Sequence, residues 1–494
     1  MTLEEIFALS SAADQITQLK KRATPEPNTP KNWDAWEPSR HAIMIDKERY
    51  PDGVRIRKDE WEDSTGKKHP AEMEPDPINR IALPIEQDQV NIHTAFTVGN
   101  EPKMTSDADT SDEKELYALI QRVGRRNKLK YVNKRIVRSW LSEQEVAEYW
   151  YVVDDIGFWP SIIAKVRAKL GLTSKAEKST ATKRLKCMIW SPFRGDKLYP
   201  KFDANGKLVA CSREYEVKND DGTKVTKFMT VTDTMVYTWV CDQDWALDPV
   251  NTFKHGFTKL PVIYSYRPKT LCADIETIRE RLEELTSEYA DCIDYNFYPR
   301  IVAEGKVIGR PTKENGDMIQ ITNGGKVYYL TWTQTPEQVK FEFNNHMEQA
   351  YAFTQTPRLT VEALKGIGEV PSGTAFRFVF MGTLIAVDNH AETMGEHFQR
   401  RVNFLQSAIA SLLPRYEKAA SSLFVEVEIE PLVLDDMEKR IANAVKATAG
   451  GPVASTKTGV ILAGIVDEVE EEVALIEQEQ AAEAGAKTEP TQEE

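Results

Sequence analysis

The chain has 494 residues, of which 41% are hydrophobic and 28% are charged, and its formal net charge is −14. This composition predicts a globular protein of about three modules that buries a sizeable core, while the negative charge argues against a surface covered with nucleic acid, because neutralising phosphates requires clustered lysine and arginine. The five cysteines contain no CxxC pair, so the sequence predicts neither a disulfide framework nor a zinc site.

The first residues are acidic and amphipathic, unlike the basic and then apolar pattern of a signal peptide. No apolar run approaches the ~18 residues that a membrane span requires, so we expect a soluble protein made inside the cell. Residues 1–22 are predicted to form one short amphipathic helix. The proline- and tryptophan-rich stretch that follows, up to residue 84, has no period and predicts an irregular connector that wraps over other elements.

Two helices are predicted next, over residues 111–127 and 132–150, and the chain across their junction is basic. Residues 122–138 contain eight lysines and arginines and no acid. A solvated or subunit-facing helix surface is the simpler interpretation, and contact with nucleic acid is the alternative. Only Tyr131 and Trp140 are available there for stacking on bases, so binding of a single strand has weak support.

From residue 184 to residue 266 the hydrophobic period changes to two. The dipeptides Asn205-Gly206 and Asp221-Gly222 separate alternating runs, which is the strongest short-range signal of a β-hairpin. The sequence therefore predicts an antiparallel meander, which completes a domain of helices and then strands over residues 85–265.

Residues 272–296 form a predicted helix with one apolar stripe. Its opposite face is predicted to meet water or a polar lumen and carries Glu276, Arg279, Glu280, Glu283 and Glu284. Short strands are expected between residues 299 and 334. A second helix then starts at Thr335 with a capping box and proline at the first helical position. A small β module is thus inserted between two helices.

A glycine-bearing loop that includes Lys365, Gly366 and Gly368 precedes a long predicted helix over residues 374–412. At 1.5 Å per residue that helix extends for ~55 Å. A movable loop between two rigid helices favours a mechanical part over a substrate pocket. Beyond it we expect a strand at 423–429, helices at 435–448 and 457–479, and a disordered acidic tail.

Two stretches have partial resemblance to ligand-binding loops. Residues 451–458 are one residue short of a P-loop, and the chain before them is predicted to be helix instead of the strand that a P-loop needs, so a helix-cap turn is favoured. Residues 107–112 begin like a calcium loop but have Asp112 at the glycine position and Ala118 at the twelfth position. They are better interpreted as the capped, acidic start of a helix.

The long helix carries several potential metal ligands: His390, Glu392, Glu396 and His397. No HExxH spacing places two histidines four residues apart, so polar positions packed beside a neighbouring element are favoured over a metal site. The sequence contains no GxSxG and no GxGxxG after a predicted strand. It therefore gives no positive case for an enzyme, a catalytic residue, a metal or a cofactor.

The order of these elements resembles the portal (head-to-tail connector) proteins of tailed bacteriophages. Helix, small β insertion, helix, flexible loop, long helix and helical C-terminal segment follow one another in both. Four local stretches, distributed along residues 91–479, are also similar to segments of that family: residues 91–104, 256–264, 372–375 and 455–472.

This resemblance implies an α+β, portal-type protomer that forms a ring of roughly twelve subunits at one vertex of a capsid. It assigns a part of the ring to each predicted segment. The implied parts are an N-terminal helix and connector (1–84), the wing (85–265 with 374–431), two stem helices (266–298 and 335–357), the clip (299–334), the tunnel loop (358–373), the crown (432–480) and an acidic tail (481–494).

The resemblance also implies that the tunnel loop faces double-stranded DNA in the channel. Net negative charge would reduce friction on the phosphates, Lys365 would steer the strand, and Gly366 and Gly368 would let the backbone shift. The implied DNA-facing residues are Glu362, Lys365, Gly366, Ile367, Gly368, Glu369, Val370, Pro371 and Ser372.

The implied partners are further copies of the chain, double-stranded DNA, the large terminase at the clip, a head-completion or adaptor protein, and the major capsid and scaffolding proteins. No cofactor and no membrane are implied, and the protein would leave the host cytoplasm as part of the virion. Two alternatives stay open. One is another ring component of a virion or secretion apparatus, and the other is a nucleic-acid-processing enzyme that uses residues 122–138.

Overall fold

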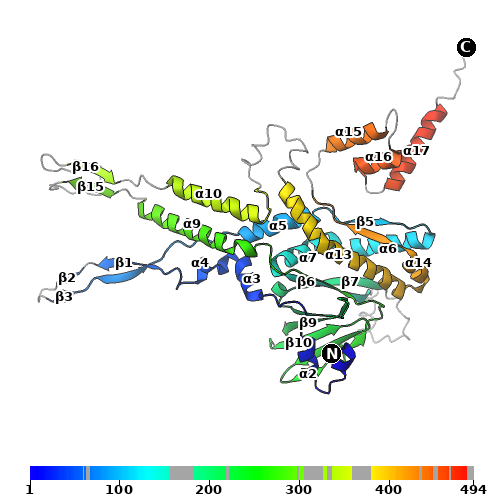
Figure 1. The fold of residues 1–494 in the computed structure, drawn as a ribbon, viewed down its shortest axis with the longest axis horizontal. Helices are drawn as coiled ribbons and strands as arrows, with labels where there is room; N and C mark the ends of the chain where they lie inside the picture. The colour runs from blue at the N-terminus through cyan, green and yellow to red at the C-terminus, as the bar shows by residue number, and fades with distance from the viewer. Residues whose placement is uncertain are drawn as a thin grey trace, which may run out of the picture. The chain divides into compact units, whose positions relative to one another are not determined.

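The computed structural model divides into two compact units (Figure 1). The first unit comprises Met1–Thr356 and Thr383–Pro431, and the second comprises Pro357–Gly382 and Leu432–Glu494. The residues that the structure describes are 1–58, 60–62, 67–155, 182–218, 222–296, 300–304, 326–330, 336–358, 380–432, 437–448, 454–466 and 469–486.

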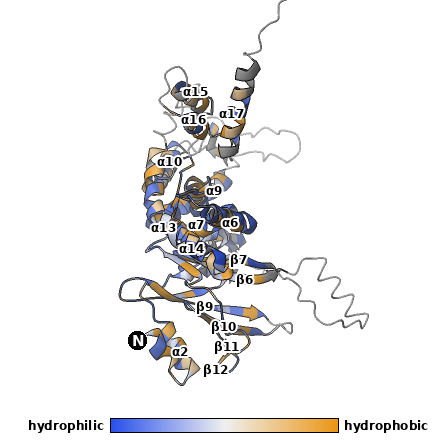
Figure 2. Ribbon diagram, turned by 90° about the vertical axis from the view of Figure 1, so that its right-hand side faces the viewer, coloured by the Kyte–Doolittle hydropathy of each residue, from blue (hydrophilic) through white to orange (hydrophobic). Residues whose placement is uncertain are grey.

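The chain starts with two short helices, α1 (Leu3–Phe7) and α2 (Ala12–Leu19), so the prediction of one helix over residues 1–22 is wrong. Gln15 ends the first helix, because its amide donates to the carbonyls of Phe7 and Leu9 at 3.3 and 2.8 Å. The resulting turn lets both helices bury apolar side chains in one aromatic cluster of the neighbouring sheet, against which α2 lies in Figure 2.

The connector does wrap over other elements as predicted, but much of it is regular. It forms a helix and a helical turn that precede two short strand pairs, in which β1 pairs with β4 and β2 with β3. These elements are α3 (Thr29–Trp36), α4 (Ala42–Ile45), β1 (Gly53–Lys58), β2 (Trp61–Glu62), β3 (Lys68–His69) and β4 (Glu72–Asp76).

Two antiparallel sheets follow the first helices. The predicted meander is confirmed in the order β12-β11-β10-β9-β8, with β13 paired to β11, and both predicted hairpin glycines, Gly206 and Gly222, have positive φ. The second sheet has the order β14-β6-β7. The strands are β6 (Glu145–Asp155), β7 (Thr182–Trp190), β8 (Lys197–Phe202), β9 (Leu208–Lys218), β10 (Lys224–Val231), β11 (Met235–Cys241), β12 (Trp245–Leu247), β13 (Phe253–Lys254) and β14 (Val262–Tyr266).

Helix α6 (Ser111–Asn127) agrees with its prediction, whereas the helix predicted over 132–150 ends early. Helix α7 (Leu129–Glu143) stops where Gln144 takes a left-handed conformation with φ of 73°. The next residues form β6 because strands β14 and β7 hydrogen-bond to it from its two sides. Sheet pairing with distant strands therefore overrides the helical pattern of residues 145–150.

The predicted order of helix, β insertion, helix and long helix is confirmed within the described residues. Helix α13 carries a buried face that packs into the core with α5, α7 and the start of α9. A further strand, β17, pairs with β5. These elements are α5 (Ile85–Val98), β5 (Lys103–Ser106), α9 (Glu276–Asn296), β15 (Arg300–Glu304), β16 (Lys326–Leu330), α10 (Pro336–Phe353), α13 (Met381–Leu412), α14 (Glu417–Ser422) and β17 (Val425–Glu428).

In the second unit, α15 (Met437–Thr448) agrees with its prediction. The single helix predicted over 457–479 is instead two helices, α16 (Thr456–Ala463) and α17 (Val469–Ala486), because Gly464 ends α16 with φ of 61°. Helix α16 packs on α15 so closely that a Cβ atom at Gly459 would clash with Thr448. The disordered tail predicted over 481–494 is wrong for residues 481–486, which belong to α17, and residues 487–494 lie outside the described residues.

Candidate functional site

Helices α9 and α10 form the pair that the sequence assigns to a stem. Figure 1 shows them side by side, with β15 and β16 at one end. Arg281 of α9 donates to Glu342 of α10 through Nε and Nη2, at 3.1 and 3.0 Å, and His346 lies 3.7 Å from the same carboxylate. Half-exposed ionic contacts of this kind join the two helices directly but add little stability.

The polar face predicted on α9 is not uniformly exposed, which corrects the expectation for two of its five residues. Arg279 and Glu283 are buried, with exposures of 3% and 1%. The other three are half-buried and each forms an ion pair, at 2.7 to 2.9 Å: Glu276 with Lys31, Glu280 with Arg49, and Glu284 with Arg281. Two of these three cations come from the N-terminal connector, which covers this face.

Arg279 and Glu283 are buried because other parts of the chain supply partners for them. Arg279 lies 3.2 Å from Glu86 of α5. Burial raises the pKa of Glu86 to about 7, although the charge of Arg279 opposes this shift. Glu283 contacts the imidazole of His41 through Oε1. The two residues therefore hold α9 to α5 and to the connector, and they are not candidates for lining a polar lumen.

A segment of the connector, residues 79–83, is fastened along α9 by a regular set of hydrogen bonds. Alternate backbone N–H groups donate to side chains that follow one another by four positions on the helix. Two extended residues span ~6.6 Å and four helical residues ~6.0 Å, so the two spacings nearly match. The bonds run from Asn79 to Asp291 (2.8 Å), from Ile81 to Ser287 (3.0 Å) and from Leu83 to Glu283 (2.9 Å).

Helix α13 is joined to the rest of the first unit by a buried charged cluster. Arg401 donates to Glu148 of β6 through Nε at 2.8 Å, and its Nη1 donates to Asn133 of α7 at 2.6 Å. His397 lies 3.2 Å from Glu148 and 2.8 Å from Ser265 of β14. Burial alone would raise the pKa of Glu148, but Arg401 and His397 together hold that pKa below its usual value.

The protonation of His397 follows from this geometry. Burial lowers the pKa of the imidazole in spite of the neighbouring carboxylate, so Glu148 is ionised with Arg401 as its cation and His397 is neutral. A neutral ring donates from Nε2 to Glu148 and accepts from the Ser265 hydroxyl at Nδ1. The packing interpretation of His390 and His397 is thereby confirmed, since both are buried against protein side chains.

A pair of buried histidines, His93 and His390, lies between α5 and α13. The rings of His93 and His390 lie 5.3 Å apart, and the ring of Trp140 is 5.5 Å from that of His390. Burial lowers the pKa of His93 to about 4, and burial followed by repulsion from His93 also lowers the pKa of His390. Both rings are therefore neutral at pH 7.

We expect His93 to lower the free energy of unfolding as the pH falls from about 6.5 to about 4, an effect that the raised pKa of Glu86 opposes in the unmodified protein. In this pH range the unfolded chain binds protons that the native histidines do not bind. For His93 this difference lowers the free energy of unfolding by about 3 kcal/mol once the pH is below its native pKa. In His93→Gln the amide keeps a contact to Thr356 and does not titrate, so the loss should be smaller. Urea titrations at fixed protein concentration between pH 7 and pH 4 measure this, and parallel pH profiles for the two proteins would contradict it.

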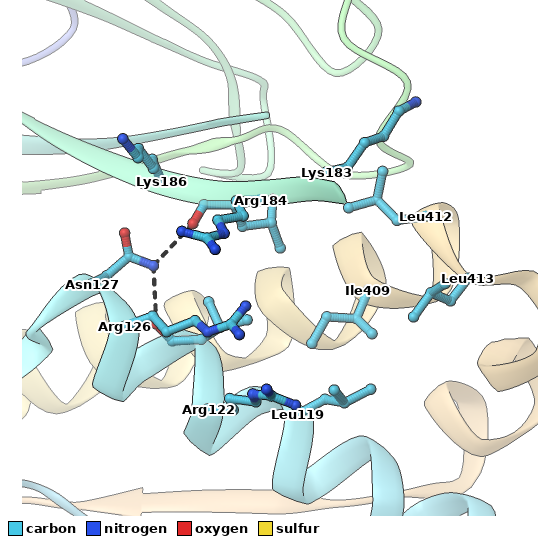
Figure 3. Close-up of a pocket in the computed structure, with 12 residues that line it drawn as sticks. Leu119, Arg122, Arg126, Asn127, Lys183, Arg184, Lys186, Ile409, Leu412 and Leu413 are labelled. Atoms are coloured by element: carbon cyan, nitrogen blue, oxygen red, sulfur yellow. Dashed lines mark hydrogen bonds between the residues drawn. The ribbon is translucent and has the colours of Figure 1, made fainter. Parts of the chain in front are cut away.

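The predicted basic run borders a cavity that the sequence does not indicate. The cavity has a volume of about 880 Å³ and lies between α6, β7 and the end of α13. Figure 3 shows cationic side chains and leucine or isoleucine side chains around it. We call it the basic cavity, and its described lining residues are Leu119, Arg122, Val123, Arg126, Asn127, Lys183, Arg184, Leu185, Lys186, Ile409, Leu412 and Leu413.

Other predicted site residues lie outside the described part of the chain. These include all of the predicted DNA-facing loop, residues 362–372, and the clip apart from β15 and β16. The described residues contain no cluster of metal-binding side chains, and none of the described helices is long and apolar enough to cross a membrane.

One comparison with known proteins, the scan of family models, identifies a family for this chain. The model of the family described as "Phage portal protein, SPP1 Gp6-like" matches residues 55–486. No curated protein sequence matches the chain. Similar solved structures include chains titled "Virion of native gene transfer agent (GTA) particle" (10% identity, TM-score 0.37), "Neck of empty GTA particle computed with C6 symmetry" (11%, 0.38) and "Neck of native GTA particle computed with C12 symmetry" (11%, 0.37). Each match covers 78% of this chain and 90% of the other.

Proposed function

The chain belongs to the family of SPP1 Gp6-like phage portal proteins, and from this premise we propose that its copies form a ring of roughly twelve subunits at one vertex of a capsid. Double-stranded DNA passes through the channel of this ring when the terminase motor packages it and again when it is ejected. The observation that carries the proposal is the match of the family model over residues 55–486.

Within this ring, α9 and α10 are the stem, and residues 299–334 between them are the clip to which the terminase and later a head-completion protein bind. The pairing of β15 with β16 and the ionic contacts between the two helices support this assignment, because they make the inserted segment an extension of a braced helix pair. Residues 85–265 and 374–431 are the wing, and residues 432–480 are the crown.

The tunnel loop is residues 358–373, and residues 362–372 of it face the DNA. Of the stem residues, Glu276, Glu280 and Glu284 are proposed for the channel because they keep partial exposure, and Arg279 and Glu283 are not, because they are buried. An acidic chain suits a conduit, because tight binding of phosphates would slow the passage of DNA. The protein itself hydrolyses nothing, and the motor supplies the work.

Electron microscopy of the purified full-length protein tests the proposal. We expect class averages of negatively stained particles to show a ring of roughly twelve subunits with a central channel, and we expect neither ATPase nor nuclease activity from the same sample. A monomer under conditions in which the capsid proteins assemble, or nuclease activity abolished by substitutions in residues 122–138, would favour the nucleic-acid-processing enzyme. A ring that never joins a capsid would favour another ring component.

A further inference from the structure

The basic cavity differs in charge from the rest of the molecule. The chain as a whole carries a net charge of −14, yet the described lining has five cations and no acid. Arg122, Arg126, Lys183 and Lys186 are exposed, and none of them forms an ion pair with another residue that the structure describes. In Figure 3 these cations come from two sides, from α6 and from β7. Such a concentration of positive charge favours an anionic ligand.

The floor of the cavity is apolar. Three elements contribute to the floor: α6 with Leu119 and Val123, β7 with Leu185, and α13 with Ile409 and Leu412. Leu413, which is 45% exposed, lies at its edge. Residues on the inner side of this floor belong to a buried cluster of the first unit, so the floor is held by the core. A cavity of about 880 Å³ has the size of a typical ligand site.

The combination of an apolar floor and a cationic rim distinguishes between two kinds of anionic ligand. Duplex DNA presents phosphates on its outside and has no apolar group that reaches the floor of a cavity, so it would use the rim alone. A peptide with both carboxylates and leucine-type side chains matches both parts. Arginine also pairs with a carboxylate through two parallel hydrogen bonds, and arginines surrounded by apolar contacts are frequent centres of binding energy.

The chain segment that joins β6 to β7 is a poor candidate for this ligand. Residues 156–181 contain five lysines and arginines and one glutamate, so their charge has the same sign as that of the rim. This segment is therefore not the complementary ligand.

We propose that the basic cavity is a docking site for an acidic, amphipathic segment of a partner protein. Apolar side chains of this segment enter the floor, and its carboxylates pair with Arg122, Arg126 and the lysines of β7. The inference rests on the chemistry of the cavity and does not require the proposed function, so the two can fail separately.

Fluorescence anisotropy with the full-length protein tests this site. The probes are a short labelled peptide of glutamate and leucine, the same peptide with lysine in place of glutamate, and a labelled DNA duplex. We expect only the glutamate–leucine peptide to bind, and we expect Arg122→Glu with Arg126→Glu to weaken its binding by about tenfold or more. Leu413→Ser should weaken binding by about threefold through the floor, because its apolar contact is lost.

The matched control is Arg125→Glu with Lys130→Glu. It makes the same change in net charge at two exposed residues that do not line the cavity, and it should alter binding by less than about twofold, because exposed charges act weakly at a distance. Equal weakening by both double variants would overturn the proposal in favour of general electrostatic attraction. Absence of peptide binding would overturn the docking proposal. Binding of the DNA duplex that is abolished by Arg122→Glu with Arg126→Glu would also overturn it, because this result would identify a DNA contact.

Assembly of the variants distinguishes docking from a contact between subunits. We expect Arg122→Glu with Arg126→Glu to elute from a sizing column with the same mass as the unmodified protein. Loss of the oligomer in this variant but not in the control would show that the cavity is an interface between copies of the chain, and would overturn the docking site. The microscopy test for a ring does not depend on the peptide result, so failure of one proposal leaves the other testable.

Discussion

Replacing Glu148 by leucine should lower the free energy of unfolding of the first unit by about 3–5 kcal/mol, because it removes one partner of a fully buried ion pair. Both partners of this ion pair are buried, with side-chain exposures of 0% for Glu148 and 4% for Arg401. The leucine would leave the guanidinium without its carboxylate and His397 without an acceptor for Nε2. Urea titration followed by tryptophan fluorescence measures the change.

The adjacent ion pair on the same helix is a matched control. Arg400 pairs with Glu396 at 2.6 Å, with side-chain exposures of 57% and 65%. Glu396→Ala should therefore cost less than about 1 kcal/mol, because solvent screens an exposed pair. A second variant, Glu148→Leu with Arg401→Met, should recover much of the stability, since it replaces both charges by apolar groups. Equal effects of Glu148→Leu and Glu396→Ala would contradict the role assigned to burial.

The double substitution Gly366→Pro with Gly368→Pro should leave the ring intact and impair DNA packaging, if residues 362–372 move as DNA advances. Proline fixes φ and removes an N–H group, so the loop loses the freedom that glycine provides. Each additional ~1.4 kcal/mol in the barrier to a movement slows that step about tenfold, so we expect a packaging rate lower by about tenfold or more. Nuclease-protected DNA in an in vitro packaging reaction measures this.

Alanine at the same two positions is the control for the loss of glycine itself. Gly366→Ala with Gly368→Ala keeps both N–H groups and restricts the backbone much less than proline, so packaging should be reduced less. Microscopy of both variants must show rings, since a failure of assembly would explain the loss without any role in translocation. Normal packaging by the proline variant with intact rings would refute the tunnel-loop assignment.

Several features of this fold are determined by short stretches of sequence. The hairpin at Asn205-Gly206 is predicted because its turn needs a residue of positive φ, a local constraint that Gly206 meets without strain. Helix α9 is predicted because its apolar side chains repeat every three or four positions. Helix α10 is predicted from the capping box and the proline at its start, and the insertion between the two helices follows from a change of period. The basic run at 122–138 is also visible directly, and so is the acidic balance of the chain.

Other features depended on partners that are far away in the chain. Residues 145–150 have a helical pattern, but β7 and β14 pair with them on both sides. In the sequence, the polar stripe of Glu283, Ser287 and Asp291 indicates a solvated helix face. In the structure, three backbone N–H groups of the connector donate to these side chains at matching spacing. The sequence contains a signal for this contact, because the three polar residues are four positions apart, but the spacing does not identify the donor.

The sequence by itself therefore determined the antiparallel meander and its hairpin turns, the order of helix, β insertion, helix and long helix, and the family, because turn chemistry, hydrophobic period and motif order are properties of neighbouring residues. Only the tertiary structure decided which charges are buried and which are exposed. Glu148, Arg279 and Glu283 have the same side-chain chemistry as the exposed charges beside them, and what differs is the desolvation and pairing that distant segments impose. The basic cavity is likewise decided by the tertiary structure, because α6 supplies one part of its rim, β7 supplies the other part, and α13 completes its floor.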